Sequence, residues 1–195
     1  MRTARRAVPP HARLRAGTAL ARRVARLPAF RRARDIGLYL GRDGEIDPAP
    51  LGALALAQGK RVWLPVVRPR GGLEFARLVP GARYARNRFG IPEPACFRRQ
   101  RRPAGRLDLV VVPLVAFDGE GRRLGMGGGF YDRALAGARR PALVGVAFAL
   151  QEVPRLPARP WDVPMDVVVT ERGVVRPAPR PARRQEQTIE KETKT

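Results

Sequence analysis

The residues with the clearest capacity for chemistry form one glycine-rich segment at residues 123–132, Arg-Leu-Gly-Met-Gly-Gly-Gly-Phe-Tyr-Asp. It follows a continuous apolar run at 109–113 and precedes a stretch, 130–138, that we expect to be helical. Glycines allow the main chain to bring its amides close to an anion, and the helix start adds a partial positive charge. Arg123 can bind a phosphate, and Asp132 can offer an oxygen to Mg²⁺. The segment therefore indicates a phosphate-binding loop.

The glycine spacing does not match either of the common phosphate-binding fingerprints. It has neither the Gly-x-x-x-x-Gly-Lys-[Ser/Thr] pattern nor the Gly-x-Gly-x-x-Gly pattern. On the residues of this segment alone, a tight strand-to-helix turn that binds nothing remains an alternative.

The rest of the composition excludes several kinds of catalysis. The chain contains no serine, one histidine (His11) and one cysteine (Cys96). A Ser–His–Asp triad is therefore impossible, an internal disulfide cannot form, and a Cys–His dyad or a Cys/His metal cluster is not expected. Chemistry in this chain must come from main-chain amides, carboxylates and arginines.

The elements that must position the glycine-rich segment alternate between strands and helices. The patterns predict helices over 11–27, 47–59 and 130–138, strands over 36–40, 61–67, 109–113, 142–147 and 167–170, an edge strand at 73–78 and a long loop over 80–107. This alternation is typical of an α/β fold with a mainly parallel sheet flanked by helices. The glycine-rich segment then follows the carboxyl end of a parallel strand, where open α/β sheets bind ligands.

Length and composition bound the organisation of the chain. Its 195 residues, 44% of them hydrophobic, suit one folded domain, which we place at 1–175. Residues 176–195 turn to Pro and Arg and then to Gln, Glu, Lys and Thr, so we expect a disordered basic and polar tail. We find no apolar run long enough to span a membrane and no secretory signal, and we expect a cytoplasmic protein.

The net charge of +22, from 39 basic and 17 acidic residues, raises the possibility of a nucleic-acid-binding module without catalysis. The arginine runs at 31–34 and 98–102 favour this alternative. The aromatic residues are few, at 6%, and are not interleaved with the basic runs as a stacking platform requires. We favour an arginine-rich, solvated surface, and expect neither a specific nucleic acid nor a membrane as a partner.

The glycine-rich segment resembles the Arg-x-Gly-x-Gly-x-Gly-[Phe/Tyr]-Tyr-Asp motif of the 5-formyltetrahydrofolate cyclo-ligase (5,10-methenyltetrahydrofolate synthetase) family. Three further segments are similar to the same family in the same order. They are Gly44-Glu45-Ile46-Asp47, the 88–94 motif Arg-Phe-Gly-Ile-Pro-Glu-Pro, and the 161–171 motif Trp-Asp-Val-Pro-Met-Asp-Val-Val-Val-Thr-Glu. The resemblance covers about residues 1–175.

This resemblance implies a fold like that of ribose-5-phosphate isomerases and CoA transferases. It implies an ATP-dependent ligase of one-carbon metabolism that converts 5-formyltetrahydrofolate to 5,10-methenyltetrahydrofolate, ADP and phosphate through a phosphorylated formyl intermediate. Both nucleophiles then belong to the substrate, so the protein only positions reactants and stabilises charge. A relative with the same loop but another substrate, either carboxylate-rich or a sugar phosphate, is the second enzymatic alternative. We expect a monomer.

The resemblance also implies roles for individual residues. ATP contacts are implied for Arg2, Arg5, Arg6, Arg123, Leu124, Gly125, Met126, Gly127, Gly128, Gly129, Phe130 and Tyr131. Folate contacts are implied for Leu40, Glu45, Met126, Gly127, Gly128, Gly129 and Phe130. Arg123 and Tyr131 would be the catalytic residues, and Asp132 and Asp166 would hold Mg²⁺ beside the co-substrate ATP. The carboxylate of Glu45 suits a pterin ring, which presents paired N–H donors.

Overall fold

One eight-stranded sheet organises the chain in a computed structural model that describes residues 1–69, 71–137 and 139–178. From one edge to the other the strands are β12 (Val174–Val175), β11 (Val167–Val169), β10 (Ala142–Val146), β7 (Leu109–Pro113), β1 (Asp35–Gly37), β2 (Arg61–Val67), β3 (Leu73–Arg77) and β6 (Arg101–Pro103). The five strands from β11 to β2 are parallel, and the outer strands at both edges pair antiparallel. The predicted α/β fold with a mainly parallel sheet is confirmed.

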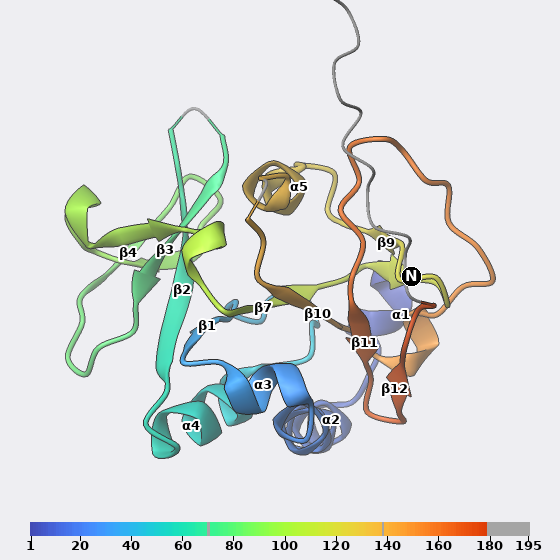
Figure 1. Ribbon diagram of the computed structural model, residues 1–195. Helices are drawn as coiled ribbons and strands as arrows, with labels where there is room; N and C mark the ends of the chain where they lie inside the picture. The colour runs from blue at the N-terminus through green and yellow to red at the C-terminus, as the bar shows by residue number, and fades with distance from the viewer. Residues whose placement is uncertain (70, 138, 179–195) are drawn as a thin grey trace, which may run out of the picture.

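Helices cover both faces of this sheet (Figure 1). On one face lie α2 (Pro10–Ala25), α3 (Pro28–Arg32) and α4 (Ala49–Ala57), and on the other lies α5 (Phe130–Leu135). Alternate residues of β7 enter different cores: Leu109 and Val111 pack with the α2–α4 side, whereas Val110 and Val112 pack with the α5 side. This double burial explains why β7 has no polar residue.

The strand order reverses direction between β1 and β7. The chain runs from β1 to β2 on one side, and from β7 through β10 to β11 on the other. Ligands bind open α/β sheets beyond the carboxyl ends of the strands at such a switch point. The segments that leave β1 and β7 at this end, residues 38–46 and 114–129, contain most of the residues implied to bind substrates.

Several elements differ from the sequence-based expectations. The expected loop at 80–107 contains a small hairpin of β4 (Tyr84–Arg86) and β5 (Pro92–Pro94), two 3₁₀ turns, η1 (Arg98–Gln100) and η2 (Ala104–Arg106), and the edge strand β6. These short strands are rich in Pro and Arg and have no alternation of apolar and polar residues, so the sequence pattern did not predict them. The helix expected at 130–138 ends at Leu135.

Short elements also occupy the chain ends and the connections. They are α1 (Arg2–Arg6), the hairpin of β8 (Ala116–Phe117) with β9 (Arg123–Leu124), and the 3₁₀ turn η3 (Ala149–Gln151). Most of the predicted tail, residues 179–195, lies outside the described residues. Within the described part of the chain, every helix is too short or too polar to cross a bilayer.

Candidate functional site

A hollow of about 430 Å³ lies beyond the carboxyl end of β1 and collects residues from four distant segments. We call it the main hollow. Its lining residues are Arg2, Arg6, Leu40, Gly41, Arg42, Asp43, Arg86, Gly90, Ile91, Pro92 and Met126. Four of these side chains are guanidinium groups and one is a carboxylate, so the hollow is suited to a polyanion. It brings together residues for which ATP and folate contacts were implied separately.

The loop after β1 supplies one wall of this site. Tyr39 is buried, and its hydroxyl donates a hydrogen bond to the carbonyl of Ile46, which closes residues 39–46 into a compact turn. Within the turn, the Glu45 N–H donates to the Arg42 carbonyl at 2.9 Å, and the Arg42 N–H donates to Glu45 Oε2 at 3.1 Å. These reciprocal bonds fix the Glu45 carboxylate without using all of its acceptor capacity.

Glu45 is a nearly buried acid of this loop. Its side chain is 8% exposed, and Arg5 Nη1 lies 3.8 Å from Oε1. Burial raises the pKa of Glu45, and the Arg42 N–H and the charge of Arg5 oppose this only partly. A desolvated carboxylate of this kind forms strong bonds with paired N–H donors.

The N-terminal helix α1 is held to the same loop by arginines that share one acid, Asp43. Arg2 Nη2 lies 3.0 Å from Asp43 Oδ2, Arg6 Nε pairs with Oδ1, and Arg5 Nη2 lies 3.2 Å from Oδ2. Arg5 also donates to the Asp43 carbonyl, at 2.8 Å, and to the Leu114 carbonyl, at 3.4 Å. The hydrogen bond from Arg6, more than any other contact, lowers the pKa of Asp43. Arg2 and Arg6 therefore reach the main hollow, whereas Arg5 is buried beneath it.

The β8–β9 hairpin delivers the glycine-rich segment to the site. Its turn is built around Asp118, which is fully buried and accepts hydrogen bonds from the N–H groups of Glu120, Arg122 and Leu156 and from Arg122 Nε. Beyond β9, residues 125–128 are exposed and α5 begins after Gly129, which has the left-handed φ of 60°. The loop is therefore open to ligands and is not sealed under side chains.

Arg123 and Asp132 face each other across the glycine-rich segment. Arg123 Nη2 lies 2.6 Å from Asp132 Oδ1, and Nη1 donates to the Val163 carbonyl. The side chain of Arg123 is 5% exposed, so its guanidinium is a part of the loop's internal structure. Asp132 Oδ1 also accepts from the Val163 N–H at 3.2 Å.

Tyr131 lies in the first turn of α5 and is affected by the charge of Glu45 in the loop after β1. Burial raises the pKa of Tyr131, and the nearby Glu45 carboxylate raises it further. The pKa of Tyr39 is raised for the same two reasons, and Tyr131 contributes there as well. The structure therefore brings Tyr131, Tyr39 and Glu45, which are up to 92 positions apart in sequence, into one cluster of acidic and phenolic groups.

The 88–94 motif closes the site from the side of the small hairpin. The ring of Phe89 packs edge-on against Phe130, with centroids 5.5 Å apart and planes at 80°. Arg42 Nη1 donates to the Phe89 carbonyl at 3.2 Å, and Glu93 Oε1 accepts from the N–H of Val67 at 2.8 Å. The motif thus connects the loop after β1 with the start of α5. Sequence reasoning did not assign Arg42, Arg86 or the 90–92 segment to the site, although the motif indicated this region.

The structure does not bring Asp166 to the main hollow. Asp166 immediately precedes β11, and its carboxylate contacts Arg140 Nη2 at 2.5 Å and the Leu143 N–H at 2.8 Å. These contacts lie at the amino-terminal ends of β10 and β11, whereas Glu45 follows the carboxyl end of β1. Because these strands are parallel, the two positions lie at opposite ends of the strands, on opposite sides of the sheet along the strand direction. Residue spacing could not reveal this, because it depends on strand direction.

Metal-binding groups are sparse in the described part of the chain. No three His, Cys, Asp or Glu side chains within residues 1–69, 71–137 and 139–178 are grouped so as to hold a metal ion. Asp132 keeps one oxygen, Oδ2, without a hydrogen bond to the described residues. The N–H of Val163 donates a hydrogen bond to Asp132. Asp162 is the residue before Val163 in the sequence, so the main chain of this acid of the 161–171 motif lies next to Asp132.

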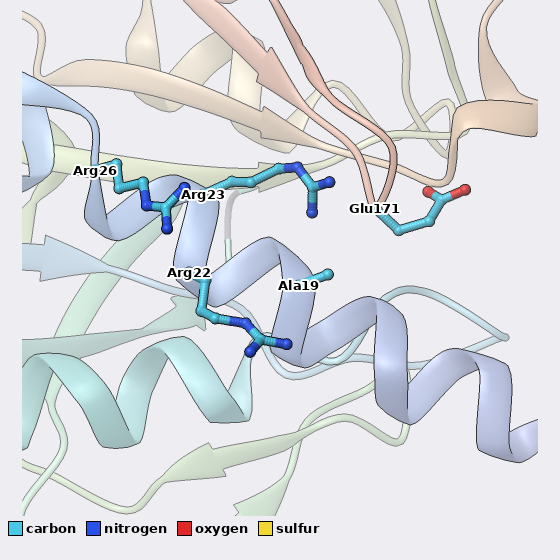
Figure 2. Close-up of a pocket in the computed structure, with 5 residues that line it drawn as sticks. All are labelled: Ala19, Arg22, Arg23, Arg26 and Glu171. Atoms are coloured by element: carbon cyan, nitrogen blue, oxygen red, sulfur yellow. The ribbon is translucent and has the colours of Figure 1, made fainter.

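A second hollow, of about 450 Å³, lies on the outer side of α2 (Figure 2). Its lining residues are Ala19, Arg22, Arg23, Arg26 and Glu171. None of these was predicted to bind a substrate. The Glu171 carboxylate accepts a hydrogen bond from the Ala149 N–H at 2.9 Å, which gives the end of the 161–171 motif a structural role.

Comparisons with known proteins agree with this site. The family model described as the 5-formyltetrahydrofolate cyclo-ligase family matches residues 1–171. The 5-formyltetrahydrofolate cyclo-ligase of Escherichia coli K12 is 41% identical over 174 residues, covering 87% of this chain and 96% of that protein. The cyclo-ligase of Haemophilus influenzae is 43% identical over 144 residues, covering 71% of this chain and 77% of its own.

A solved structure agrees as well. The 5,10-methenyltetrahydrofolate synthetase of Aquifex aeolicus superposes with a TM-score of 0.79 at 33% identity, covering 96% of this chain and 94% of that one. These similarities favour a ligase over a nucleic-acid-binding module. The chain belongs to the 5-formyltetrahydrofolate cyclo-ligase family, and is an enzyme of the ligase class.

Proposed function

We propose that this protein converts 5-formyltetrahydrofolate and ATP to 5,10-methenyltetrahydrofolate, ADP and phosphate. The observation that carries the proposal is the composition of the main hollow, where Arg2 and Arg6 meet Leu40 and Met126. These residues come from three separate segments of the chain, and the family resemblance implied ATP contacts for the first two and a folate contact for each of the others. A phosphoryl donor and its acceptor must meet in one place, and this hollow offers such a place.

The ATP phosphates would lie between the glycine-rich segment and the N-terminal arginines. Residues 125–128 expose their main chain on one side, and the half-exposed guanidiniums of Arg2 and Arg6 stand on the other. Arg42 and Arg86 add two further cations at the rim. Charge spreads over the phosphoryl oxygens in the transition state, so these fixed donors would lower the barrier.

The folate would lie against the loop after β1. The Glu45 carboxylate would accept the paired N–H donors of the pterin, and Leu40 and Met126 would supply apolar contact. The Glu45 charge acts on Tyr131, so Tyr131 would lie beside the pterin that Glu45 binds.

The reaction needs no nucleophile from the protein. The formyl oxygen attacks the γ-phosphorus of ATP, the bond to the bridging oxygen breaks, and ADP leaves. The folate N10 then attacks the activated formyl carbon and loses its proton, and the former formyl oxygen leaves with the phosphate. The residues of the main hollow orient the two substrates and balance the charge that moves between them.

Mg²⁺ would accompany ATP rather than occupy a site built only by the protein. Mg²⁺ is usually held by one or two carboxylates together with substrate phosphates, and it would neutralise charge on the phosphates. Asp132 Oδ2, which accepts no hydrogen bond from the part of the chain that the structure describes, fits this role, whereas Asp166 is already engaged by Arg140 and Leu143. A cytoplasmic, monomeric enzyme remains our expectation.

The test is a spectroscopic assay of the purified protein with 5-formyltetrahydrofolate, ATP and Mg²⁺. We expect the methenyl chromophore to appear, with one ADP released for each product formed, and to vanish without ATP. No chromophore at saturating substrates would refute the proposal. A thermal-shift comparison of folates with sugar phosphates checks the second enzymatic alternative, since only the true substrate class should stabilise the protein.

A further inference from the structure

Asp43 has an unusual place in the main hollow, because it is the only acid among the described residues that line it. The side chain is 12% exposed, and it stands among the guanidiniums of Arg2, Arg5 and Arg6. An acid in a polyanion site repels the ligand, so its presence needs a compensating role. Its own main chain is also unusual, with a φ of 54°, the left-handed region that is costly for a residue other than glycine.

The contacts of Asp43 leave part of each outer guanidinium available. Arg2 uses Nε and Nη2, and Arg6 uses Nε, although each guanidinium carries five N–H donors. The side chains of Arg2 and Arg6 remain 51% and 56% exposed. Asp43 thus holds one edge of each group and leaves the other edge to face the hollow.

Helix α1 depends on this loop for its position. Its one buried side chain is that of Arg5, which binds the Asp43 carboxylate and carbonyl. The main chain of α1 also lies directly on Gly44, where an added Cβ would come within 3.1 Å of Arg6 Cα and 3.2 Å of the Arg5 carbonyl oxygen. Close backbone contact and a shared acid therefore seat α1 against the loop that carries Glu45.

We propose that Asp43 is a positioning residue, which orders Arg2 and Arg6 for the phosphate chain of ATP. This rests on the proposed function. In solution, two arginines on a five-residue helix at the chain terminus would sample many rotamers, and binding would have to order them. Asp43 orders them in advance, so the ligand meets a preorganised array.

Titration calorimetry with ATP and Mg²⁺, without folate, tests the proposal. We expect Asp43→Asn to weaken ATP binding at least tenfold and to raise the KM for ATP similarly, while kcat and the KM for the folate change less than threefold. Glu120→Gln is the matched control, because Glu120 is 70% exposed, its side chain pairs only with Arg122 in the described structure, and the charge change is identical. This control should bind ATP as the parent does.

A double-mutant cycle separates positioning from a general loss of structure. In an Arg2→Ala/Arg6→Ala background, Asp43→Asn should weaken ATP binding no further, because its effect acts through those arginines. An additive loss, unchanged binding in the single variant, or tighter binding would each overturn the proposal, the last by showing that Asp43 competes with phosphate. Asp43→Glu, which keeps the charge, should recover part of the affinity. Failure of the parent protein to form the methenyl chromophore would instead refute the proposed function.

Discussion

Arg123 and Asp132, the first and last residues of the glycine-rich segment, form an ion pair in which Nη2 and Oδ1 are 2.6 Å apart. The pair closes the segment into a ring, and the Val163 carbonyl and N–H complete the closure from the 161–171 motif. The exposed glycines are therefore presented by a structured frame. The guanidinium of Arg123, for which an ATP contact was implied, is thus also a part of this frame through Asp132 and Val163.

Removal of the Asp132 carboxylate should affect both stability and catalysis. In Asp132→Asn, the nearly buried guanidinium of Arg123 loses its charged partner. We expect a loss of about 2–3 kcal/mol in the free energy of unfolding, less than for a fully buried pair because Asp132 is 26% exposed. Denaturant titration measures this loss, and the chromophore assay should show at least a ~100-fold lower kcat. An unchanged stability would show that the ion pair is unimportant for the loop.

Gly125 offers a test for ligand contact that avoids disturbing the fold. An alanine Cβ at this position would meet no atom within 4 Å, and Gly125 is not among the glycines with positive φ. We expect Gly125→Ala to keep the parent's unfolding temperature yet weaken ATP binding about tenfold, because the methyl group would occupy space that a phosphate needs. Thermal unfolding and calorimetry measure the two effects.

Gly119→Ala is the control for that substitution. Gly119 also has no atom within 4 Å of the added Cβ and no positive φ, but it lies in the turn between β8 and β9. This variant should match the parent in both measurements. Equal ATP affinities for the two variants and the parent would place the phosphates away from residue 125.

Glu45 should show opposite effects on stability and on folate binding. Because the pKa of Glu45 is raised in the folded protein, ionisation of its carboxyl disfavours folding. This cost is absent below the ordinary pKa, grows as the pH rises through the folded pKa, and is complete above it; each pKa unit corresponds to about 1.4 kcal/mol. Glu45→Gln should therefore be more stable than the parent at neutral pH, with the difference shrinking toward pH 4.

The same substitution should weaken folate binding about tenfold or more, since an amide offers the pterin one acceptor in place of two. Urea titrations at several pH values and folate calorimetry provide the two measurements. A variant that loses stability at neutral pH, or one that keeps its folate affinity, would contradict this assignment of Glu45.

The ring contact between Phe89 and Phe130 should couple the 88–94 motif to the start of α5. We expect a coupling energy of about 0.5–1.5 kcal/mol in a double-alanine cycle followed by denaturant titration. Phe97→Ala is the comparison, because Phe97 is 68% exposed and should show no coupling to Phe130. A coupling near zero for Phe89 would mean that the motif and the helix are positioned independently.

Asp166 should prove structural. Since its carboxylate binds Arg140 and Leu143 at the amino-terminal ends of β10 and β11, we expect Asp166→Asn to lower stability by about 1 kcal/mol and to leave the Mg²⁺ concentration for half-maximal activity unchanged. Magnesium titrations of Asp166→Asn and Asp132→Asn measure the difference. A several-fold rise in the Mg²⁺ concentration for half-maximal activity of Asp166→Asn would instead support the Mg²⁺-binding role that the resemblance implied.

The local features of this protein could be predicted from its residues alone. Apolar runs without polar residues predicted β7 and β10, helical periodicity predicted α2, and the glycine-rich segment pointed to a loop at the carboxyl end of β7. These features depend on interactions between residues that are near one another in the sequence. A continuous run of Val and Leu at 109–112, for example, is typical of a strand buried on both faces. The four motifs, which occur in the same order as in the family, indicated the family to which the chain belongs.

The contacts between charged groups, in contrast, became known from the fold. Arg6 and Asp43 are 37 positions apart, and Phe89 reaches Phe130 across 41 positions. Their proximity depends on the strand order at the β1–β7 switch point, which no local pattern encodes. Strand direction likewise places Asp166 at the amino-terminal end of the parallel strands, whereas Glu45 lies beyond their carboxyl end. Charge–charge contacts are set by the packing of whole elements, and the residues that make them have no periodicity of their own.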